Sequence, residues 1–328
     1  MEASFSLMIW NENRSRLQSF EGESNSRSLR YGKDENAIKE LLCHRTSAQI
    51  AQITRAYEDL YKEKLMDRLN SEFSAILQMH SKPAIMLWAT DPADRDAKWA
   101  HKAIKEKKGE RGALMIIEIA CGSSPDHLMA VRKAYSTRYS RSLEEEIAFT
   151  SAFKEPMREF LVQLVTSYRY KGDNAEESSA QSEAAILYNG LQTNHLLQEQ
   201  IMRMISLRSK SHINATLQYY QQEYGKSIEE ELAACTSPFS ALMKVVIWCL
   251  ISPEKHFAEV LRGSMEGLGT DEDTLTRGVV SRAEIDMELI KEEYKRRYNT
   301  TLTHDITEDT SGLYKDILLA LIGPEKEP

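Results

Sequence analysis

The stretch EYKRRY, from Glu293 to Tyr298, decides the fold, because the chain holds three more stretches built the same way. Its two tyrosines are four residues apart, which places both on one face of a helix. The same spacing recurs in AYEDLY, AYSTRY and YYQQEY, which begin at Ala56, Ala134 and Tyr219. The first tyrosines of the four pairs follow one another at intervals of 78, 85 and 74 residues. The pattern indicates a unit that occurs four times.

The same register continues beyond the tyrosines. Apolar residues stand four and eight positions after each second tyrosine, and in the last unit they are Leu302 and Ile306. An apolar or aromatic side chain at every fourth position is typical of an amphipathic helix. The sequence therefore predicts an all-α fold made of four helical repeats. We expect these repeats to span residues 7–80, 88–168, 180–252 and 256–323.

Stretches that contain proline or many polar residues fall between the four units. We expect these stretches to act as separators. They are Ser81–Asp96, Tyr170–Glu183 and Ile251–His256.

Composition limits the classes of function. The formal net charge of -8 argues against a nucleic-acid binder, which usually carries a basic field. It also argues against adhesion to anionic lipid, unless something bridges the two negative surfaces. The longest nearly apolar run, Ala241–Ile251, contains a lysine and has about half the length that spans a bilayer. Four cysteines and an N-terminus unlike a secretory signal favour a reducing, cytoplasmic protein.

The strongest candidate site is the stretch MEGLGTDED, from Met265 to Asp273, in the fourth unit. Gly267 and Gly269 precede three acidic residues at an expected helix start. Glycine tolerates positive φ angles, so such a loop can turn several carbonyl oxygens toward one point. A plain helix start, with Thr270 as N-cap and the acids stabilised by the helix dipole, explains the acids but not the glycines.

A comparison of the four units links this loop to a distant carboxylate. Only the first and fourth loops are followed by an acidic pair, Asp34-Glu35 and Asp271-Glu272. The residues found thirty-nine positions after the four loop ends are Glu72, Thr150, Cys235 and Asp309. Again only the first and fourth units carry a carboxylate. Because Ca²⁺ prefers about six to eight oxygens from carboxylates, carbonyls and water, the sequence predicts calcium sites in these two units.

With these residues identified, the chain resembles the annexin family. The likeness rests on the four units, the MEGLGTDE loop and the segment DTSGLYKDILLALIG from Asp309 to Gly323. The segment WATDPADRDA and the His44-Arg45 step resemble the plant branch of the family. The resemblance implies four repeats of about five helices each in a slightly curved disc. It further implies calcium-dependent binding of anionic phospholipid membranes on the convex face.

The resemblance also implies particular calcium ligands. In the fourth repeat they are the carbonyls of Met265, Gly267 and Gly269 and the carboxylate of Asp309. In the first repeat they are the carbonyls around three loop residues and one distant carboxylate, namely Ser28, Arg30, Gly32 and Glu72. The first loop departs from the family pattern, because Arg30 replaces a glycine and Lys33 replaces a threonine.

The second loop, KEKKGER, suggests a different kind of lipid contact. We expect its basic residues to lie on the same face as the calcium loops, and they are Lys105, Lys107, Lys108 and Arg111. Each could contact anionic headgroups directly, at about 1 kcal/mol per basic residue near the surface. A solvated basic loop without a lipid role is the plain alternative.

Two other functions stay open. Some annexins are proposed to conduct ions, and Asp96 and Arg277 stand at the corresponding channel positions, although their expected partners are replaced here. The resemblance also points to a peroxidase through His44 and to redox chemistry through Cys121 and Cys249, which would need exposed thiols with a low pKa.

We nevertheless expect no enzyme activity. Nucleotide hydrolysis lacks the P-loop context, because Tyr220 replaces the leading glycine before the GKS of Gly225–Ser227. The expected protein is cytoplasmic, uses Ca²⁺, binds no nucleic acid and associates peripherally with membranes when calcium rises. A homo-oligomer on the membrane is a further possibility.

Overall fold

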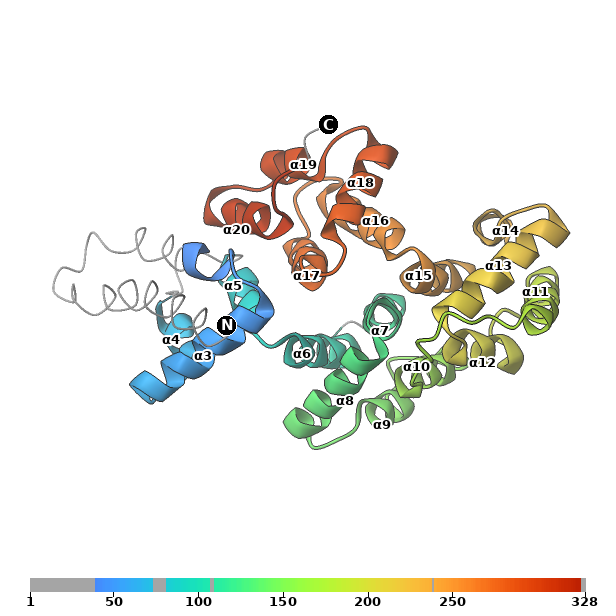
Figure 1. The fold of residues 1–328 in the computed structure, drawn as a ribbon, viewed down its shortest axis with the longest axis horizontal. Helices are drawn as coiled ribbons and strands as arrows, with labels where there is room; N and C mark the ends of the chain where they lie inside the picture. The colour runs from blue at the N-terminus through green and yellow to red at the C-terminus, as the bar shows by residue number, and fades with distance from the viewer. Residues whose placement is uncertain (1–38, 73–80, 107–108, 238, 326–328) are drawn as a thin grey trace. The chain divides into compact units, whose positions relative to one another are not determined.

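The computed structural model describes residues 39–72, 81–106, 109–237 and 239–325. Its regular elements in these ranges are all helices (Figure 1), which confirms the all-α prediction. The first repeat contains α3 (Ser47–Tyr61), α4 (Leu65–Glu72) and α5 (Ser81–Ala89). The second contains α6 (Pro92–Lys105), α7 (Glu110–Gly122), α8 (Pro125–Tyr139), α9 (Leu143–Phe149) and α10 (Met157–Thr166).

The third and fourth repeats follow the same order of five helices as the second. The third contains α11 (Glu177–Gln192), α12 (Glu199–Leu207), α13 (Lys210–Tyr224), α14 (Ile228–Ala234) and α15 (Ser240–Ile251). The fourth contains α16 (Pro253–Met265), α17 (Glu272–Arg282), α18 (Met287–Tyr298), α19 (Leu302–Asp309) and α20 (Gly312–Ile322).

Each tyrosine pair closes the third helix of its repeat. The helices α3, α8, α13 and α18 all end at the second tyrosine. The next residue adopts a left-handed conformation in every case, and these residues are Lys62, Ser140, Gly225 and Asn299. A left-handed residue is a common helix terminator, because it redirects the chain and allows the last carbonyls to be bonded. The first tyrosine of each pair is buried, which anchors the helix in the core.

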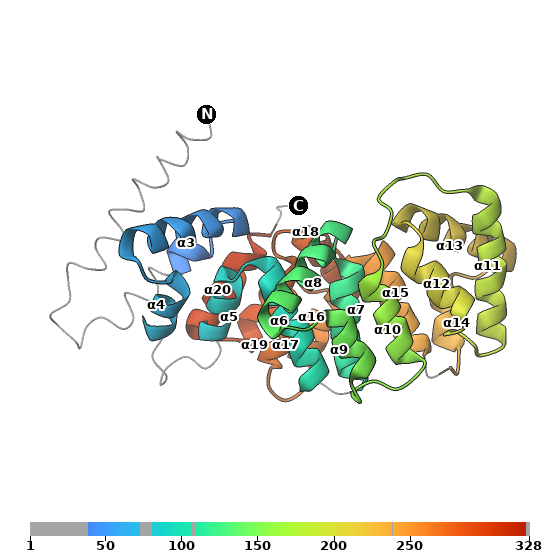
Figure 2. The ribbon, with the colours of Figure 1, turned by 90° about the horizontal axis from the view of Figure 1, so that it is seen from below.

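The chain divides into two compact units, and each unit combines two repeats. Unit 1 consists of residues 1–92 and 257–328, and therefore holds repeats 1 and 4. In it, α5 packs against α17 and α20. Unit 2 consists of residues 93–256 and holds repeats 2 and 3. In it, α7 packs against α15 and α10 against α12 (Figures 1 and 2), so the second and fifth helices of a repeat carry the contact.

The expected separator Ser81–Asp96 contains helical structure instead. It holds α5 and the first turn of α6, and α5 packs on α3 and α4. Pro92 is the first residue of α6, where proline is favoured because its fixed φ suits a helix start. The proline therefore begins a helix here, and the apolar residues around it, such as the fully buried Ile85, fill the core of the first repeat.

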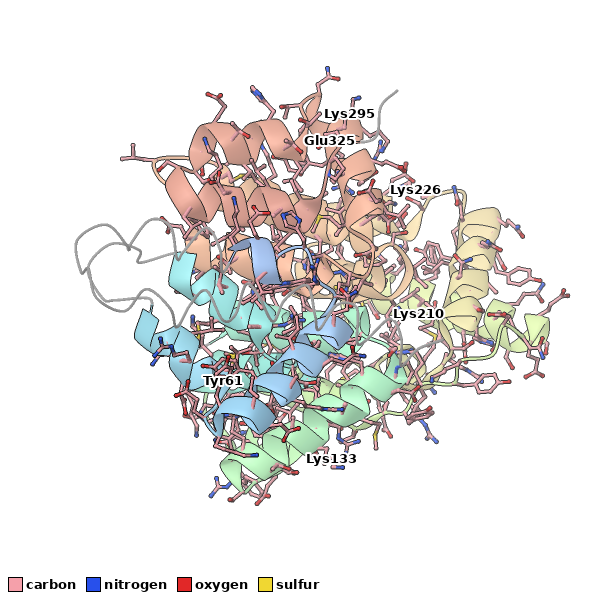
Figure 3. The ribbon with its side chains drawn as sticks, turned by 60° about the vertical axis from the view of Figure 1, so that its left-hand side comes forward. Tyr61, Lys133, Lys210, Lys226, Lys295 and Glu325 are labelled. Carbon is pink, nitrogen blue, oxygen red and sulfur yellow. The ribbon has the colours of Figure 1, made fainter. Side chains whose placement is uncertain are left out.

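Charged side chains cover the outer surfaces of the helices. Lys133 on α8, Lys226 after α13 and Lys295 on α18 are exposed and are labelled in Figure 3. No helix in the described ranges combines the length and the apolar character needed to cross a bilayer.

Candidate metal centre

The loop of the fourth repeat connects α16 to α17. Within it, Gly267 has φ +107° and Gly269 has φ +85°, values that side-chain-bearing residues rarely adopt. A side chain at either glycine would meet no atom within 4 Å, so the conformation, not crowding, requires glycine there. The Asp271 amide donates to the Ser264 carbonyl at 2.8 Å and closes the loop. Between the two glycines, Leu268 is fully exposed.

The structure brings this loop to Asp309, the carboxylate that the sequence comparison paired with it. The Thr270 hydroxyl donates to Oδ2 of Asp309 at 2.6 Å and lies 3.2 Å from its backbone carbonyl. Asp309 is the last residue of α19 and is half-buried. The predicted neighbourhood of loop and acid, thirty-nine residues apart in sequence, is therefore present.

The start of α17 differs from the expected one. Asp271, not Thr270, is the N-cap, because its carboxylate accepts from the Thr274 amide at 3.1 Å. The Thr274 hydroxyl also donates to Asp271 at 2.9 Å. Thr270 lies outside the helix, and its hydroxyl points to Asp309 instead. The dipole argument holds for Glu272 and Asp273, which occupy the first turn of α17.

A second contact fastens the loop to α19. The Arg262 guanidinium, in the last turn of α16, bonds Glu266 at 2.9 Å and Asp305 at 2.7 Å. Asp305 also accepts from the Tyr294 hydroxyl at 2.6 Å. This network joins α16, α18 and α19 to Glu266, the first residue after α16. The sequence indicates only part of this network. Arg262 and Glu266 are four residues apart, but Asp305 is far from both along the chain.

The last helix supports the site from the other side. The Tyr314 hydroxyl on α20 lies 2.8 Å from the Thr276 hydroxyl and donates to the Glu272 carbonyl at 3.2 Å. Burial is the main reason why the pKa of Tyr314 is raised above its usual value, so the hydroxyl stays protonated. The contact holds the first turn of α17 next to α20 and keeps the loop on a rigid base.

The first-repeat site lies mostly outside the described residues. Ser28, Arg30 and Gly32 belong to that undescribed part of the chain. Glu72 is the last residue of α4, the place that Asp309 takes on α19. The equivalence of α4 and α19 is therefore seen, but the predicted ligand set stays a prediction.

The second and third loops keep the same neighbourhood without a carboxylate. In the second repeat, the Gly109 amide donates to the Ala152 carbonyl at 3.1 Å, so the start of α7 lies beside the segment after α9. In the third repeat, Asn194 lies 3.5 Å from the Cys235 thiol and 3.4 Å from the Thr236 hydroxyl. The third loop is thus joined to Cys235, the position that corresponds to Asp309, and Gly109 is joined to the residue two positions after Thr150. Both contacts are made by groups that carry no charge.

The residues expected to contact lipid in the second loop have different surroundings. Lys105, the last residue of α6, forms an ion pair with Glu146 at 2.5 Å. Lys107 and Lys108 lie outside the described residues. Arg111 is exposed in the first turn of α7. Lys105 is therefore engaged within its own repeat, and Arg111 is open to solvent.

The residues considered for redox chemistry are placed unfavourably for it. Cys121 and Cys249 are both buried, and burial raises the pKa of the Cys121 thiol to about 11. A reactive thiol needs access and a low pKa. His44 is exposed and lies 3.5 Å from Glu40. The GKS stretch serves local structure, because Gly225 ends α13 and Ser227 begins α14 as a capping-box residue.

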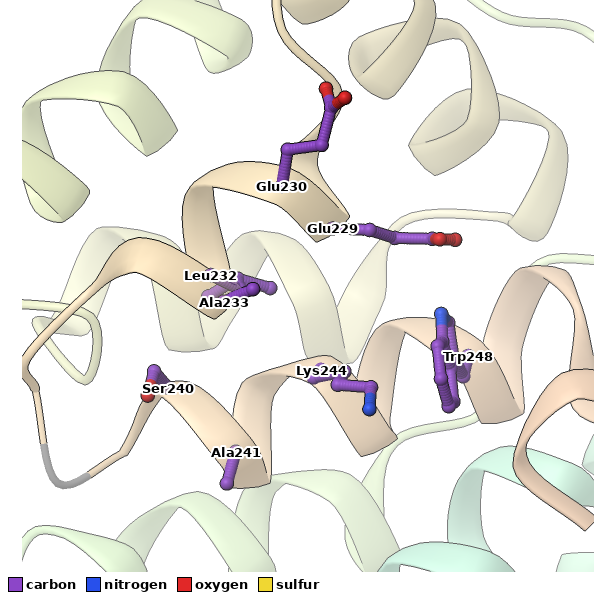
Figure 4. Close-up of a pocket in the computed structure, with 8 residues that line it drawn as sticks. All are labelled: Glu229, Glu230, Leu232, Ala233, Ser240, Ala241, Lys244 and Trp248. Atoms are coloured by element: carbon purple, nitrogen blue, oxygen red, sulfur yellow. The ribbon is translucent and has the colours of Figure 1, made fainter. Parts of the chain in front are cut away.

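An open groove of about 520 Å³ lies between α14 and α15 (Figure 4). Its charged groups already have partners within the fold. Glu229 pairs with Lys255 at 2.6 Å, Glu230 accepts from the Ser227 amide at 2.8 Å, and the Lys244 ammonium lies 4.0 Å from the centre of the Trp248 ring. The groove is separate from the loop that meets Asp309.

Side-chain clusters of the usual transition-metal type are not found in the described ranges, where no group of three His, Cys, Asp or Glu residues is placed to hold a metal ion. The donor set predicted for the fourth loop is of a different kind, made of backbone carbonyls and one carboxylate. These hard oxygen atoms are the ligands that Ca²⁺ prefers, and thiolate and imidazole ligands are typical of zinc.

Comparisons with known proteins agree with the fourfold repeat. The family model for annexin matches residues 27–79, 95–164, 182–240 and 256–321. The chain is 39% identical to Annexin D3 of Arabidopsis thaliana, over 89% of this chain and 91% of that protein. It is 41% identical to Annexin-like protein RJ4 of Fragaria ananassa, over 90% of this chain and 92% of that protein.

The fold also matches a solved structure that contains calcium. The structure of calcium-bound annexin (Sm)1 aligns with a TM-score of 0.77 and 26% sequence identity. The alignment covers 89% of this chain and 86% of that chain.

Proposed function

The chain belongs to the annexin family, and on that premise we propose that it binds anionic phospholipid membranes in a calcium-dependent manner, chiefly through the loop of its fourth repeat. Annexins as a family bind calcium and membrane phospholipids, and they are generally binding proteins and not enzymes. In this chain the ion is held by the carbonyls of Met265, Gly267 and Gly269 and by the carboxylate of Asp309.

The hydrogen bond from Thr270 to Asp309 carries the proposal. At 2.6 Å it fixes one carboxylate oxygen beside the loop whose glycines have positive φ angles. The Arg262 contacts to Glu266 and Asp305 also join the loop to α19. A carboxylate and a carbonyl-rich loop that are held together before binding lose less conformational entropy when an ion arrives.

Charge explains why an ion is needed. The protein carries a formal net charge of -8, and anionic lipid headgroups repel it. Bound Ca²⁺ supplies positive charge at the loop, and lipid phosphate oxygens can complete a coordination shell of about six to eight oxygens. We place a second, weaker site at the loop of the first repeat, closed by Glu72. The protein is then cytoplasmic at low calcium and peripheral to the membrane at high calcium.

Co-sedimentation with phosphatidylserine vesicles tests the proposal. Wild type is expected to sediment in calcium and to stay largely in solution in chelator, and Asp309→Asn is expected to weaken the calcium-dependent part roughly tenfold or more, because a neutral amide replaces a charged ligand. The matched control is Glu308→Gln, which changes the exposed neighbouring carboxylate of the same helix. Equal losses in both variants would show a general charge effect, and unchanged binding of Asp309→Asn would refute the assigned site.

A further inference from the structure

The corner after α9 exposes a large aromatic side chain. Phe149, the last residue of that helix, has 81% of its surface exposed. Four residues later, Phe153 is buried in the core with 1% exposed. The corner therefore keeps one phenylalanine inside and presents the other to solvent. In Figure 2, α9 ends at the lower edge of the ribbon, where the connection to α10 begins.

The position of Phe149 within its repeat is informative. It directly precedes Thr150, which stands where the fourth repeat has Asp309. At the place of Phe149, the third and fourth repeats carry Ala234 and Glu308, both exposed. The exposed aromatic thus occurs in a repeat whose loop has no acidic partner for a metal ion.

The corner is held firmly by its backbone. The Thr150 amide donates to the Glu146 carbonyl at 3.1 Å, and its hydroxyl accepts from the Ala152 amide at 3.1 Å. The Arg158 guanidinium donates to the Thr150 carbonyl at 3.4 Å. Phe149 therefore projects from a fixed turn. Its transfer into an apolar environment costs little backbone conformational entropy, because the turn is already ordered.

Exposed basic residues occur in the two segments that meet at the corner. The Gly109 amide donates to the Ala152 carbonyl at 3.1 Å, which brings Gly109 and the start of α7 beside the corner. Arg111 and Lys154 are both exposed. The nearby Glu155 is paired with Arg158 at 2.6 Å, and Glu146 with Lys105 at 2.5 Å, so these two acids are compensated within the repeat.

We propose that this corner is a second membrane contact, in which Phe149 enters the interfacial region of an anionic bilayer while Arg111 and Lys154 meet lipid phosphates, without calcium. An exposed aromatic flanked by basic side chains is the composition that favours the interface of an anionic membrane. The inference deepens the proposed function and rests on it, because the membrane reached is the same. It differs in needing no metal ion.

The test measures partitioning onto vesicles in chelator and in saturating calcium, with phosphatidylserine–phosphatidylcholine mixtures and with phosphatidylcholine alone. In chelator, Phe149→Ala is expected to reduce partitioning onto anionic vesicles roughly tenfold, equivalent to about 1.4 kcal/mol. Tyr170→Ala is the matched control, because Tyr170 is another aromatic of the same unit with 64% exposed. Phe149→Trp is expected to keep binding and to add a blue-shifted fluorescence component with vesicles, above the signal of the four native tryptophans.

The basic residues are tested by their dependence on salt. The pair Arg111→Gln/Lys154→Gln is expected to weaken binding at low ionic strength and to have little effect at high ionic strength, since salt screens surface charges. Lys133→Gln, an exposed lysine on α8, is the control. The effect of Phe149→Ala is expected to survive high salt, because it comes from apolar transfer.

Several results would overturn the inference. They are an absence of chelator-resistant binding by wild type, equal effects of Phe149→Ala and Tyr170→Ala, or equal binding to neutral and anionic vesicles in chelator. A change of oligomeric state in Phe149→Ala with unchanged vesicle binding would assign the corner to contact between copies of the chain. The Asp309→Asn variant separates the two proposals, because it is expected to lose the calcium-dependent increment and to keep the chelator-resistant binding.

Discussion

At the scale of single residues, the Asp309 carboxylate is oriented by a neutral donor, the Thr270 hydroxyl. This suits a cation site, because a hydroxyl positions the carboxylate without placing a positive charge beside the ion. The hydrogen bond to an ionised acceptor is also stronger than one between neutral groups. Thr270 is therefore expected to be a positioning residue for the proposed calcium ligand.

Replacement of Thr270 by valine keeps the shape of the side chain and removes the hydroxyl. Loss of the hydrogen bond to Asp309 is expected to raise the dissociation constant for calcium roughly tenfold, or about 1.4 kcal/mol. Calorimetric titration with calcium measures the change. Thr307→Val is the control. Thr307 lies on the same helix as Asp309, and its hydroxyl donates to the Thr303 carbonyl. Equal affinities for wild type and Thr270→Val would remove Thr270 from the account.

The cysteines give a second prediction at this scale. Burial raises the pKa of Cys43 to about 12 and of Cys121 to about 11, so both thiols are protonated and shielded near pH 8. Cys249 is fully buried, and Cys235 is partly exposed. Iodoacetamide is expected to modify Cys235 alone in the folded protein and all four cysteines in urea, as seen by intact mass. Rapid native labelling of Cys121 or Cys249 would revive the redox hypothesis.

The sequence predicts that the fourth loop and Asp309 lie together, but not that the Thr270 hydroxyl makes the contact. The thirty-nine-residue register connects Thr270 directly to Asp309, and the corresponding pairs in the second and third repeats, Arg111 with Thr150 and Leu196 with Cys235, lack the carboxylate. A threonine before acidic residues nevertheless fits an N-cap equally well. Whether Thr270 caps the helix or bonds Asp309 depends on the residue at which α17 starts. Helix ends shift by a residue or two without changing the periodicity of the sequence.

At the scale of elements, the third and fourth helices of a repeat are joined by a hydroxyl and a carboxylate. In the second and fourth repeats, the first tyrosine of the pair donates to an acid eleven residues later: Tyr135 to Glu146 at 3.1 Å and Tyr294 to Asp305 at 2.6 Å. In the first repeat, Tyr57 donates instead to Glu63, six residues later, at 2.5 Å. The third repeat differs. Its Glu231 lies 3.3 Å from Lys226, and the buried Tyr220 hydroxyl has no hydrogen-bond partner in the part of the chain that the structure describes.

We expect opposite outcomes when Tyr294 and Tyr220 are each replaced by phenylalanine. Tyr294→Phe removes the hydrogen bond that Tyr294 donates to Asp305, although Arg262 still bonds this carboxylate. The change is expected to destabilise its repeat by about 1.5–3 kcal/mol, as for hydrogen bonds to charged groups. Tyr220→Phe removes a hydroxyl that is already unsatisfied, so it is expected to be neutral or stabilising. Hydrogen exchange of the amides in α18 and α13 reports each helix separately. Similar losses of protection in the two variants would contradict this assignment.

In the second, third and fourth repeats, the second tyrosine of the pair has a partner on its ring face that the sequence does not reveal. His101 stacks on Tyr139 and Tyr188 on Tyr224, both with 3.9 Å between ring centroids. In the fourth repeat the Arg262 guanidinium lies 5.4 Å from the centre of the Tyr298 ring. Histidine, tyrosine and arginine share a flat face but no common hydropathy, so a search for apolar periodicity passes over this position.

The helix α5 shows where the periodic pattern misleads. Its nine residues include a proline and are nearly all apolar, so they give no clear amphipathic period and resemble a separator. A helix that is buried on most sides needs no polar face, and α5 packs against α3, α4, α17 and α20. The composition of α5 is therefore apolar because the helix is buried, and the same composition removes the amphipathic pattern that would identify it as a helix.

At the scale of the whole molecule, the pairing of repeats is not written in any one repeat. The described helices of the four repeats follow the same order, yet unit 1 joins the first and the last repeat and unit 2 joins the middle two. The sequence predicts the repeats from local periodicity, but the pairing depends on the fit between distant apolar surfaces such as α5 on α20 and α7 on α15. Contacts that close a loop this long cannot be inferred from spacing alone.

The net charge connects this scale to function. An acidic protein and an acidic membrane repel one another, and a shared divalent ion reverses the sign locally. Since the ion is proposed to contact both surfaces, calcium and lipid must strengthen each other's binding by the same factor. A site that held calcium without reaching the lipid would show no such coupling.

The most direct measurement is therefore a calorimetric titration of calcium into the wild-type protein, with and without phosphatidylserine vesicles, repeated with Asp309→Asn. The account predicts that anionic vesicles raise the calcium affinity at least tenfold, or about 1.4 kcal/mol of coupling, and that Asp309→Asn removes most of this increase. The same calcium affinity with and without vesicles, or an increase that survives in Asp309→Asn, would contradict a calcium bridge at the fourth repeat.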